Sequence, residues 1–111
     1  FGKKLHQHQA IQFMLADMKT KIEASRLLTW RTAWEVDNGI KNTESAAHAK
    51  RFAADSCMEI TTDAVQVFGG YGYSEEYPVA RLMRGAKVLQ IYEGSSQVQR
   101  MIIGREMVRE L

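Results

Sequence analysis

Residues 4–36, KLHQHQAIQFMLADMKTKIEASRLLTWRTAWEV, carry a regular hydrophobic pattern without a single Gly or Pro. Hydrophobic residues recur at helical spacing, whereas charged residues occupy the other faces. The hydrophobic positions are Ile11, Leu15, Met18, Ile22 and then Leu28, and the charged ones are Asp17, Lys21, Glu23 and Arg26. This pattern predicts one long amphipathic helix from about Lys4 to Val36.

The residues that follow predict a second long helix. Asn38-Gly39 is a stop signal because both residues tolerate positive φ, and Asn42-Thr43 offers a cap for a helix that reaches about Phe68. The side chains expected on its buried face are Ala53, Cys57, Ile60, Ala64 and Val67. Small side chains at this spacing favour close approach to another helix, because they cannot fill a wide gap.

Two further helices are predicted beyond a glycine-rich break. Gly69-Gly70-Tyr71-Gly72 ends the second helix and opens a loop through Glu76. Pro78 suits the first turn of a shorter third helix, which we expect to end near Gln90. A last helix is predicted from about Ser96 to Glu110, with an apolar face formed by Val98, Met101, Ile102 and Val108.

These elements predict an all-α fold, an up-down helical bundle with two long helices, one short helix and a final helix, as part of a four-helix bundle. If the short helix runs across the bundle, the loop before it and the turn after it lie at the same end. The whole chain, residues 1–111, is expected to form one domain. A domain of this size buries only about two-thirds of the surface of its extended chain. We therefore expect a fragment of a longer protein or a chain that self-associates.

Composition limits the classes of function. The chain has 111 residues with 15 Lys and Arg dispersed among 13 acidic residues, for a net charge of +2, and this pattern does not indicate nucleic-acid binding. The single Cys57 cannot form an internal disulfide, and no apolar stretch approaches the roughly 20 residues of a membrane span. His6 and His8 are two residues apart and cannot share a helix face, so no metal site is expected. His48 is expected to be exposed.

The segment Ile91-Tyr92-Glu93-Gly94-Ser95-Ser96-Gln97-Val98-Gln99-Arg100 places one carboxylate, that of Glu93, directly before a capped helix. Gly94 permits a tight turn, and the hydroxyls of Ser95 and Ser96 can satisfy the free amides of the helix start. A base at such a turn could reach a buried substrate. A glutamate beside a helix start is more commonly solvated or interacts with the helix dipole, so this segment alone leaves both interpretations open.

Other local patterns have ordinary structural interpretations. Gly69-Gly70-Tyr71-Gly72 follows a predicted helix rather than a strand, which excludes a dinucleotide-binding loop and favours a simple helix stop. Cys57 fits a small buried side chain better than a nucleophile, because no activating His lies at an obvious spacing. Gln9, Gln66 and Gln97 suit exposed positions.

The chain resembles the C-terminal helical domain of the acyl-CoA dehydrogenases along its whole length. The resemblance is carried by four blocks in the expected order: Phe1-Gly2-Lys3 with His8-Gln9, Ala33-Trp34-Glu35-Val36-Asp37, Asp63 to Gly72, and Ile91 to Arg100. Lys41 and Gly85 depart from residues common in the family, and Gly85 is expected to loosen the short helix, since Gly costs roughly 1 kcal/mol relative to Ala inside a helix.

The resemblance implies an FAD-dependent oxidoreductase that converts acyl-CoA thioesters to trans-2-enoyl-CoA. Glu93 would be the catalytic base that removes the α proton while the β carbon delivers a hydride to N5 of the flavin, and Tyr92 would line the acyl pocket beside it. The residues implied in cofactor binding are Phe1, His8, Gln9, Thr43, Gln66, Val67, Phe68, Gly69, Gly70, Gly94, Ser95, Ser96 and Gln97. Those up to Gly70 would lie at subunit interfaces, and the last four would hold the diphosphate and adenosine side of FAD.

The resemblance also implies partners. Electron-transfer flavoprotein would accept the electrons, the enzyme would be a homo-oligomer built as a dimer of dimers, and it would act in fatty acid β-oxidation in the bacterial cytoplasm or mitochondrial matrix. This chain alone is expected to be inactive, because the residues that hold the flavin ring are absent. Alternatives are an acyl-CoA oxidase or a decarboxylating dehydrogenase on the same scaffold, and a non-catalytic helical interaction module. The length of the acyl chain is not encoded in these residues.

Overall fold

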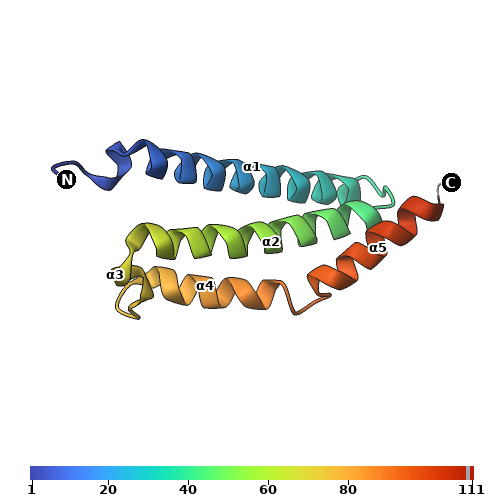
Figure 1. Ribbon diagram of the computed structural model, residues 1–111. Helices are drawn as coiled ribbons and strands as arrows, with labels where there is room; N and C mark the ends of the chain where they lie inside the picture. Colours follow the sequence, from blue (N-terminus) through green and yellow to red (C-terminus); the bar gives the residue numbers. More distant parts are fainter. Residues whose placement is uncertain (110) are drawn as a thin grey trace.

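The computed structural model describes residues 1–109 and 111, and this part of the chain is helical without any strand, which confirms the all-α prediction (Figure 1). The elements in chain order are the 3-10 helix η1 (Leu5–Gln7) and the helices α1 (Gln9–Asp37), α2 (Thr43–Phe68), α3 (Gly70–Tyr73), α4 (Pro78–Leu89) and α5 (Ser96–Arg109).

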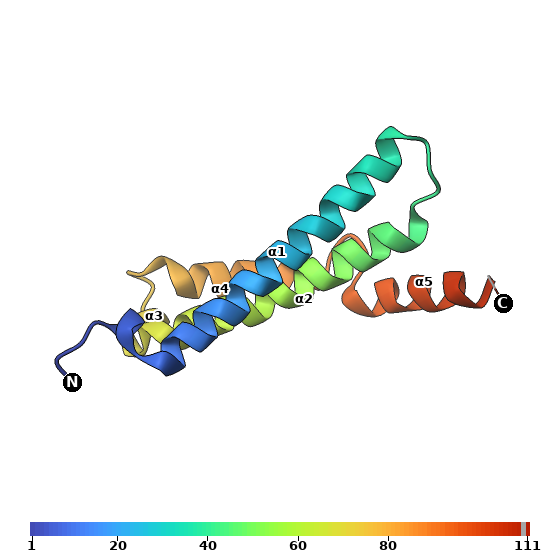
Figure 2. The same cartoon turned by 90° about the horizontal axis from the view of Figure 1, so that it is seen from above.

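Helix α2 is the centre of the molecule, because it packs against α1, α3, α4 and α5. The two long helices lie antiparallel and side by side, and α4 and α5 follow one another along the length of α2 (Figures 1 and 2). The chain therefore forms an elongated bundle with extents of 57 × 26 × 25 Å. Among the described residues no helix combines the length and apolar character that crossing a membrane requires.

The short helix α4 runs along α2 rather than across the bundle, as Figure 1 shows. The loop before α4 and the turn after it therefore lie at opposite ends of this helix. The prediction that both segments lie at the same end of the bundle is wrong. Twelve helical residues separate the two segments by about 18 Å at 1.5 Å per residue.

Most predicted helix boundaries are confirmed. Helix α2 spans Thr43–Phe68, α4 starts at Pro78, and α5 starts at Ser96. Helix α1 ends at Asp37, next to the predicted Asn38-Gly39 stop, where Gly39 has a φ of 65°. The predicted end of the last helix at Glu110 lies outside the described residues.

The first long helix starts later than predicted. Residues Leu5–Gln7 form a separate 3-10 turn, and the extended backbone of His8, with φ −88° and ψ 127°, separates it from α1. This break is stabilised locally, because the side chain of Gln7 accepts a hydrogen bond from the backbone N–H of Lys4. Helical periodicity continues across such a break, so the hydrophobic pattern does not reveal it.

The glycine-rich segment also differs from the prediction of a loop, because Gly70–Tyr73 form the short helix α3. Gly69 reverses the chain at a φ of 63°, and Gly72 then packs directly on the last turns of α2. A Cβ atom on Gly72 would lie 2.4 Å from the carbonyl oxygen of Val65 and 2.8 Å from Cβ of Phe68. The glycine is therefore required for close packing of α3 on α2, a role beyond stopping a helix.

The core is small and rich in alanine. Its buried hydrophobic residues are Met18, Ala47, Ala49, Ala54, Val79, Ala86 and Ile103. On the predicted buried face of α1, Met18 is buried, whereas Leu15 and Ile22 are 44% and 39% exposed. The five residues predicted to be buried on α2 are all partly exposed, and the buried positions are Ala47, Ala49, Ala54 and Ser56 instead. Because neighbours contact α2 from several sides, burial spreads around this helix rather than following one stripe.

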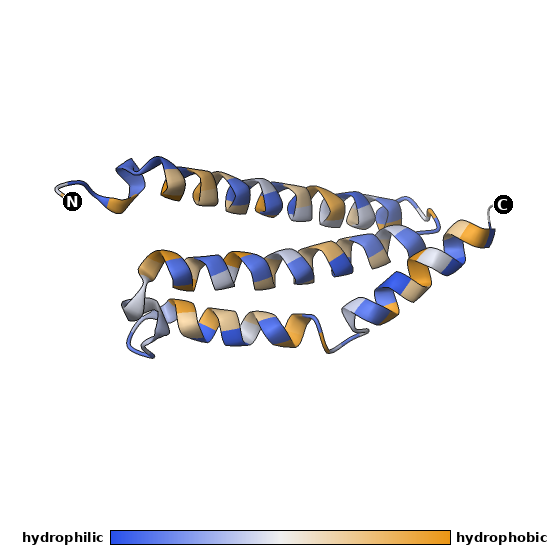
Figure 3. Cartoon of the chain, viewed as in Figure 1, coloured by the Kyte–Doolittle hydropathy of each residue, from blue (hydrophilic) through white to orange (hydrophobic). Residues whose placement is uncertain are grey.

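The apolar face predicted for α5 does not point toward the core. Val98, Met101 and Val108 are exposed, whereas Ser96, Gln99, Ile103 and Glu106 face inward. Polar contacts set this orientation, since Lys41 donates a hydrogen bond of 2.8 Å to the buried carboxylate of Glu106. Hydrophobic residues are spread along all the helices, including the C-terminal part of α5 (Figure 3), and there Met101, Met107 and Val108 are exposed.

Candidate active site

Glu93 lies in the turn between α4 and α5, and backbone hydrogen bonds close this turn at both ends. The N–H groups of Ile91 and Tyr92 both donate to the carbonyl oxygen of Val88 at 3.0 Å, and the N–H of Ser96 donates to the carbonyl oxygen of Gln90 at 3.0 Å. The segment that carries the carboxylate is therefore a fixed turn rather than an open loop.

Two consecutive residues of the turn have left-handed backbone conformations. The φ angles are 53° for Glu93 and 86° for Gly94, and Glu93 is the only non-glycine residue with positive φ in the described part of the chain. This conformation costs an L-residue with a side chain roughly 1–2 kcal/mol. Such strained residues cluster at functional sites, and the observation singles out Glu93 among the 13 acidic residues of the chain.

The Glu93 side chain is exposed and lines an open cavity of about 590 Å³. Apolar and small side chains dominate its wall, which is formed by Thr29, Ala49, Lys50, Ala53, Ala54, Cys57, Leu89, Tyr92 and Glu93. The predicted pair Tyr92 and Glu93 thus lies together at an apolar surface. Ala53 and Cys57, two of the small residues predicted on the buried face of α2, lie in this wall and are half-buried.

Lys50 connects α2 to the beginning of the turn. Its ammonium group donates a hydrogen bond to the carbonyl oxygen of Leu89, at the C-terminal end of α4, and lies 5.5 Å from the centroid of the Tyr92 ring. A cation at a helix C-terminus is favourable because the last carbonyl groups carry partial negative charge. Lys50 therefore orients both the end of α4 and the aromatic ring next to Glu93.

The start of α5 offers free hydrogen-bond donors beside Glu93. The hydroxyl oxygen of Ser95 accepts a hydrogen bond of 3.3 Å from the N–H of Val98, as expected of an N-cap residue. Within the described residues, the N–H of Gln97 has no protein acceptor. A free amide at the positive end of a 14-residue helix fits a phosphate group.

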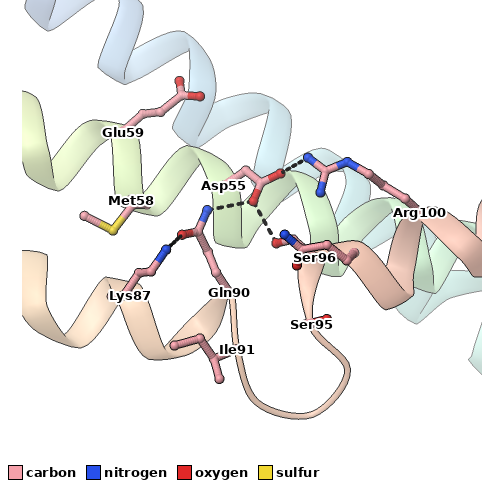
Figure 4. Close-up of a pocket in the computed structure, with 10 residues that line it drawn as sticks. Asp55, Met58, Glu59, Lys87, Gln90, Ile91, Ser95, Ser96 and Arg100 are labelled. Atoms are coloured by element: carbon pink, nitrogen blue, oxygen red, sulfur yellow. Dashed lines mark hydrogen bonds and ion pairs between the residues drawn. The ribbon is translucent and has the colours of Figure 1, made fainter.

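Asp55 of α2 holds the two ends of the turn together (Figure 4). Its Oδ1 atom accepts hydrogen bonds from the side chains of Gln90, at 2.8 Å, and Ser96, at 2.7 Å, and Arg100 donates to Oδ2 at 3.2 Å. Burial of the carboxyl group would raise the pKa of Asp55, but the hydrogen bonds from Ser96 and Gln90 and the positive charges of Arg100 and Arg51 hold the pKa below its usual value. Asp55 is therefore ionised at neutral pH.

Of the predicted cofactor residues, only Gly94, Ser95, Ser96 and Gln97 adjoin Glu93. Phe1, His8 and Gln9 lie at the end of the bundle where α2 also ends with Gln66, Val67, Phe68, Gly69 and Gly70, whereas Thr43 begins α2 at the other end (Figure 1). The hydroxyl group of Ser96 is buried and donates to Asp55, and its backbone N–H donates to the carbonyl oxygen of Gln90, so both donors of Ser96 already have protein acceptors. His48 is only partly exposed, against the prediction.

Sequence reasoning missed Lys50, Asp55 and Gln90. Asp55 lies between the small buried residues Ala54 and Ser56, so a charged residue flanked by two small ones was the available signal. Its partners Gln90 and Ser96 are 35 and 41 residues away in the sequence, and nothing in the local pattern connects them.

In this helical bundle the carboxylate of Glu93, on a strained backbone, lies between an apolar cavity and the N-terminus of α5. This arrangement suits an enzyme that removes a proton from a substrate next to a bound phosphate-bearing group. The family model of the acyl-CoA dehydrogenase C-terminal domain matches residues 1–108. The chain therefore belongs to the acyl-CoA dehydrogenase family, and the resemblance seen in the sequence is confirmed.

Two relatives of similar sequence are acyl-CoA dehydrogenases. The chain is 54% identical over 110 residues to cyclohexane-1-carbonyl-CoA dehydrogenase of Geobacter metallireducens, covering 99% of this chain and 29% of the relative. It is 56% identical over 109 residues to the short-chain-specific acyl-CoA dehydrogenase of Megasphaera elsdenii, covering 98% of this chain and 28% of the relative. The chain thus spans less than a third of the length of these relatives.

Solved structures share the fold. Butyryl-CoA dehydrogenase from Megasphaera elsdenii superposes with a TM-score of 0.96 at 56% identity, over 98% of this chain and 28% of that one. A complex of PigA with FAD gives a TM-score of 0.94 at 28% identity, over 100% of this chain and 29% of that one. These comparisons confirm the helical architecture.

Proposed function

We propose that this chain is the part of an acyl-CoA dehydrogenase that supplies the catalytic base, Glu93, and one portion of the FAD site. The observation that carries the proposal is the exposed carboxylate of Glu93 at a left-handed position of a closed turn, beside an apolar cavity. Family membership and relatives named as acyl-CoA dehydrogenases support the reaction class.

In the proposed reaction, the carboxylate of Glu93 removes a proton from the α carbon of an acyl thioester. The α carbon and β carbon then share the electron pair as a new double bond, and the β hydrogen leaves with its two electrons. Bound FAD would accept this hydride at N5, and the product would be a trans-2-enoyl-CoA. General-base catalysis of this kind contributes on the order of 10²–10⁴-fold, and positioning must contribute much of the remainder.

The apolar wall beside the turn supports this role. An acyl chain packed against the small side chains of α2 would exclude water from the carboxylate, and a desolvated carboxylate is a more effective base. Lys50 keeps the Tyr92 ring at the rim of the cavity, where it would contact the acyl group.

The residues at the start of α5 fit the diphosphate of FAD. The free N–H of Gln97 and the positive helix end would bind phosphate oxygens without a lysine, and Gly94 leaves room for the chain to turn tightly before them. Phe1, His8, Gln9, Thr43 and Gln66 to Gly70 lie away from this turn. We propose that they bind the cofactor at interfaces with other subunits, in a dimer of dimers.

Replacing Glu93 tests the proposal. In the full-length enzyme, Glu93→Gln keeps the size of the side chain but removes the base, so we expect the rate of acyl-CoA dehydrogenation to fall by at least about 10²-fold while the FAD content is retained. The rate is measured by reduction of electron-transfer flavoprotein. Glu76→Gln, an exposed carboxylate in the loop before α4, is the matched control and should keep the wild-type rate. A Glu93→Gln enzyme with a near wild-type rate would refute the proposal.

The electron acceptor distinguishes the main alternative. An acyl-CoA oxidase on the same scaffold would reduce oxygen instead of electron-transfer flavoprotein. A solved structure described for the electron transferring flavoprotein of Acidaminococcus fermentans shares 53% identity with this chain at a TM-score of 0.96. This similarity favours electron-transfer flavoprotein as the acceptor. Oxygen consumption that matches substrate turnover would favour the oxidase.

A further inference from the structure

Asp55 lies about 40 residues before Glu93 in the chain and outside every motif of the predicted site, yet its contacts converge on the Glu93 turn. Gln90 is the first residue after α4, and Ser96 is the first residue of α5. Both donate side-chain hydrogen bonds to the same oxygen, Oδ1 of Asp55. One carboxylate on α2 therefore fixes the residues on either side of the five-residue segment 91–95.

The same two residues are also joined through their backbones. The N–H of Ser96 donates to the carbonyl oxygen of Gln90 at 3.0 Å. The main chain and the carboxylate of Asp55 therefore both keep Gln90 and Ser96 close together. The side-chain oxygen of Gln90 in turn accepts a hydrogen bond of 3.0 Å from Lys87, which orients its amide toward Asp55. Figure 4 shows Gln90, Ser96 and Arg100 directed at Asp55 from three sides.

Arginine side chains hold the carboxylate itself. Arg100, on the next turn of α5, donates to Oδ2 at 3.2 Å, and Nε of Arg51 lies 3.9 Å from the same oxygen. Within the described residues, Nε of Arg51 is buried and has no hydrogen-bond partner. Hydrogen bonds to an ionised group are the stronger ones in proteins, so Asp55 is a firmer anchor than a neutral side chain would be.

The backbone of Glu93 needs such an anchor. Its left-handed conformation is unfavourable for a residue with a side chain and persists only when the surroundings impose it. Lys50 holds the carbonyl group before the turn, and Asp55 holds both of its ends. Without Asp55, residues 91–95 would relax toward more common backbone angles, and the direction of the Glu93 carboxylate would change.

We propose that Asp55 is a positioning residue for the catalytic base, because it fixes both ends of the turn that aims Glu93. The inference rests on the proposed function of Glu93. Asp55 does not line the cavity beside Glu93, but it lines a neighbouring cavity of about 460 Å³ together with Ser95, Ser96 and Gln97. The FAD content of each variant is therefore measured together with its activity, so that loss of cofactor is distinguished from misplacement of Glu93.

The test uses Asp55→Ala in the full-length enzyme, with kcat and KM measured separately. Misplacement of a reacting group by about 1 Å costs on the order of 10²-fold in rate. We therefore expect kcat to fall by about 10- to 100-fold while KM changes by less than about threefold, since substrate binding does not involve Asp55. Hydrogen exchange of the amides of residues 91–96 should become faster in the same variant.

Glu59→Ala is the matched control, because Glu59 also lies on α2 and forms an ion pair with Lys21 of α1. This variant loses a contact between helices but none with the turn, so kcat should stay within about twofold of wild type. If Asp55→Ala and Glu59→Ala lower stability alike and both leave kcat unchanged, the inference is overturned.

Gln90→Met provides a second variant should Asp55→Ala fail to fold. It removes one of the hydrogen bonds to Asp55 and keeps the side-chain volume, and we expect kcat to fall several-fold with KM unchanged. The double variant Asp55→Ala with Gln90→Met should lose no more than Asp55→Ala alone, because both changes remove the same contact. A wild-type kcat in Gln90→Met, or effects that multiply in the double variant, would contradict the inference.

The outcome separates the two proposals. If Glu93→Gln abolishes activity but Asp55→Ala leaves kcat at the wild-type value, Glu93 remains the base and only the role of Asp55 is wrong. If Glu93→Gln keeps activity, the proposed function itself fails.

Discussion

Gly94 shows how single residues shape the site. Its φ of 86° is accessible to glycine, and a Cβ atom at this position would lie 2.5 Å from Nε2 of Gln99. That nitrogen donates a hydrogen bond of 3.1 Å to the carbonyl oxygen of Gly94 itself. Any side chain here would therefore combine backbone strain with displacement of Gln99.

We expect Gly94→Ala to destabilise the protein by more than the roughly 1–2 kcal/mol that a left-handed alanine costs. Gly39→Ala is the control, because Gly39 has a similar φ of 65° with nothing within 4 Å of the added Cβ, so it incurs the strain alone. Urea unfolding of both variants measures the difference. An equal or smaller loss in Gly94→Ala would show that Gln99 does not restrain the turn.

At the scale of residues, the sequence predicts contacts between neighbours in the chain but not contacts between residues far apart in it. The Glu93-Gly94-Ser95 turn could be predicted, because a carboxylate, a glycine and an N-cap serine are adjacent in the chain. The left-handed φ of Glu93 and the contact of Asp55 with Ser96 could not, since both arise when α4 and α5 dock on α2. The catalytic role of Glu93, the substrate contact of Tyr92 and all the predicted cofactor roles, from Phe1 to Gln97, stay predictions.

At the scale of elements, helix ends were predictable and helix faces were not. Stop and cap residues are local, so Gly39, Thr43 and Pro78 mark true boundaries. The inward face of α5 depends on where Asp55 and Lys41 lie, and these polar partners outweigh its apolar residues. The sequence predicts a loop for the glycine-rich segment, whereas Gly70–Tyr73 form a helix, because the contact of Gly72 with Val65 is tertiary.

Gly85 in α4 tests how much helix propensity contributes to the stability of this element. Gly85 lies in its interior, has no positive φ, and has nothing within 4 Å of an added Cβ. We expect Gly85→Ala to stabilise the protein by about 1 kcal/mol through helix propensity alone. Gly72→Ala should instead destabilise it, because its Cβ would collide with the α2 backbone. A lower unfolding midpoint for Gly85→Ala would show that α4 is distorted at this position.

At the scale of the whole molecule, buried carboxylates join elements that few apolar contacts hold together. The hydrogen bond from Lys41 keeps the pKa of Glu106 below its usual value against the effect of burial, and the hydrogen bond from Ser45 does the same for the pKa of Glu35. Asp55 adds a third lowered pKa where α2 meets α5.

These lowered pKa values predict a loss of stability in acid. A carboxylate whose pKa is lower in the folded than in the unfolded state stabilises the fold above its unfolded pKa of about 4, and this contribution disappears as pH falls through the folded value. We expect the free energy of unfolding to drop from about pH 5 to about pH 3, and to drop less in Glu106→Gln. Urea unfolding across this range checks the prediction, and stability that rises toward pH 3 would contradict it.

Many large hydrophobic residues of the chain are exposed to solvent. Trp30, Trp34, Tyr73 and Met101 are among the side chains that the chain leaves more than half exposed. The all-α architecture could be predicted because periodicity is repeated over many residues, whereas the extent of the exposed surface depends on how the helices pack.

The removal of the α proton by Glu93 is tested most directly by isotope exchange. An acyl thioester whose β carbon carries no hydrogen can undergo the proton step but not the oxidation, so exchange at its α carbon reports the base alone. In D₂O, the full-length enzyme should replace the α hydrogens with deuterium, as followed by mass spectrometry, and Glu93→Gln should leave them in place. Equal exchange by both enzymes would contradict the assignment of Glu93 as the base.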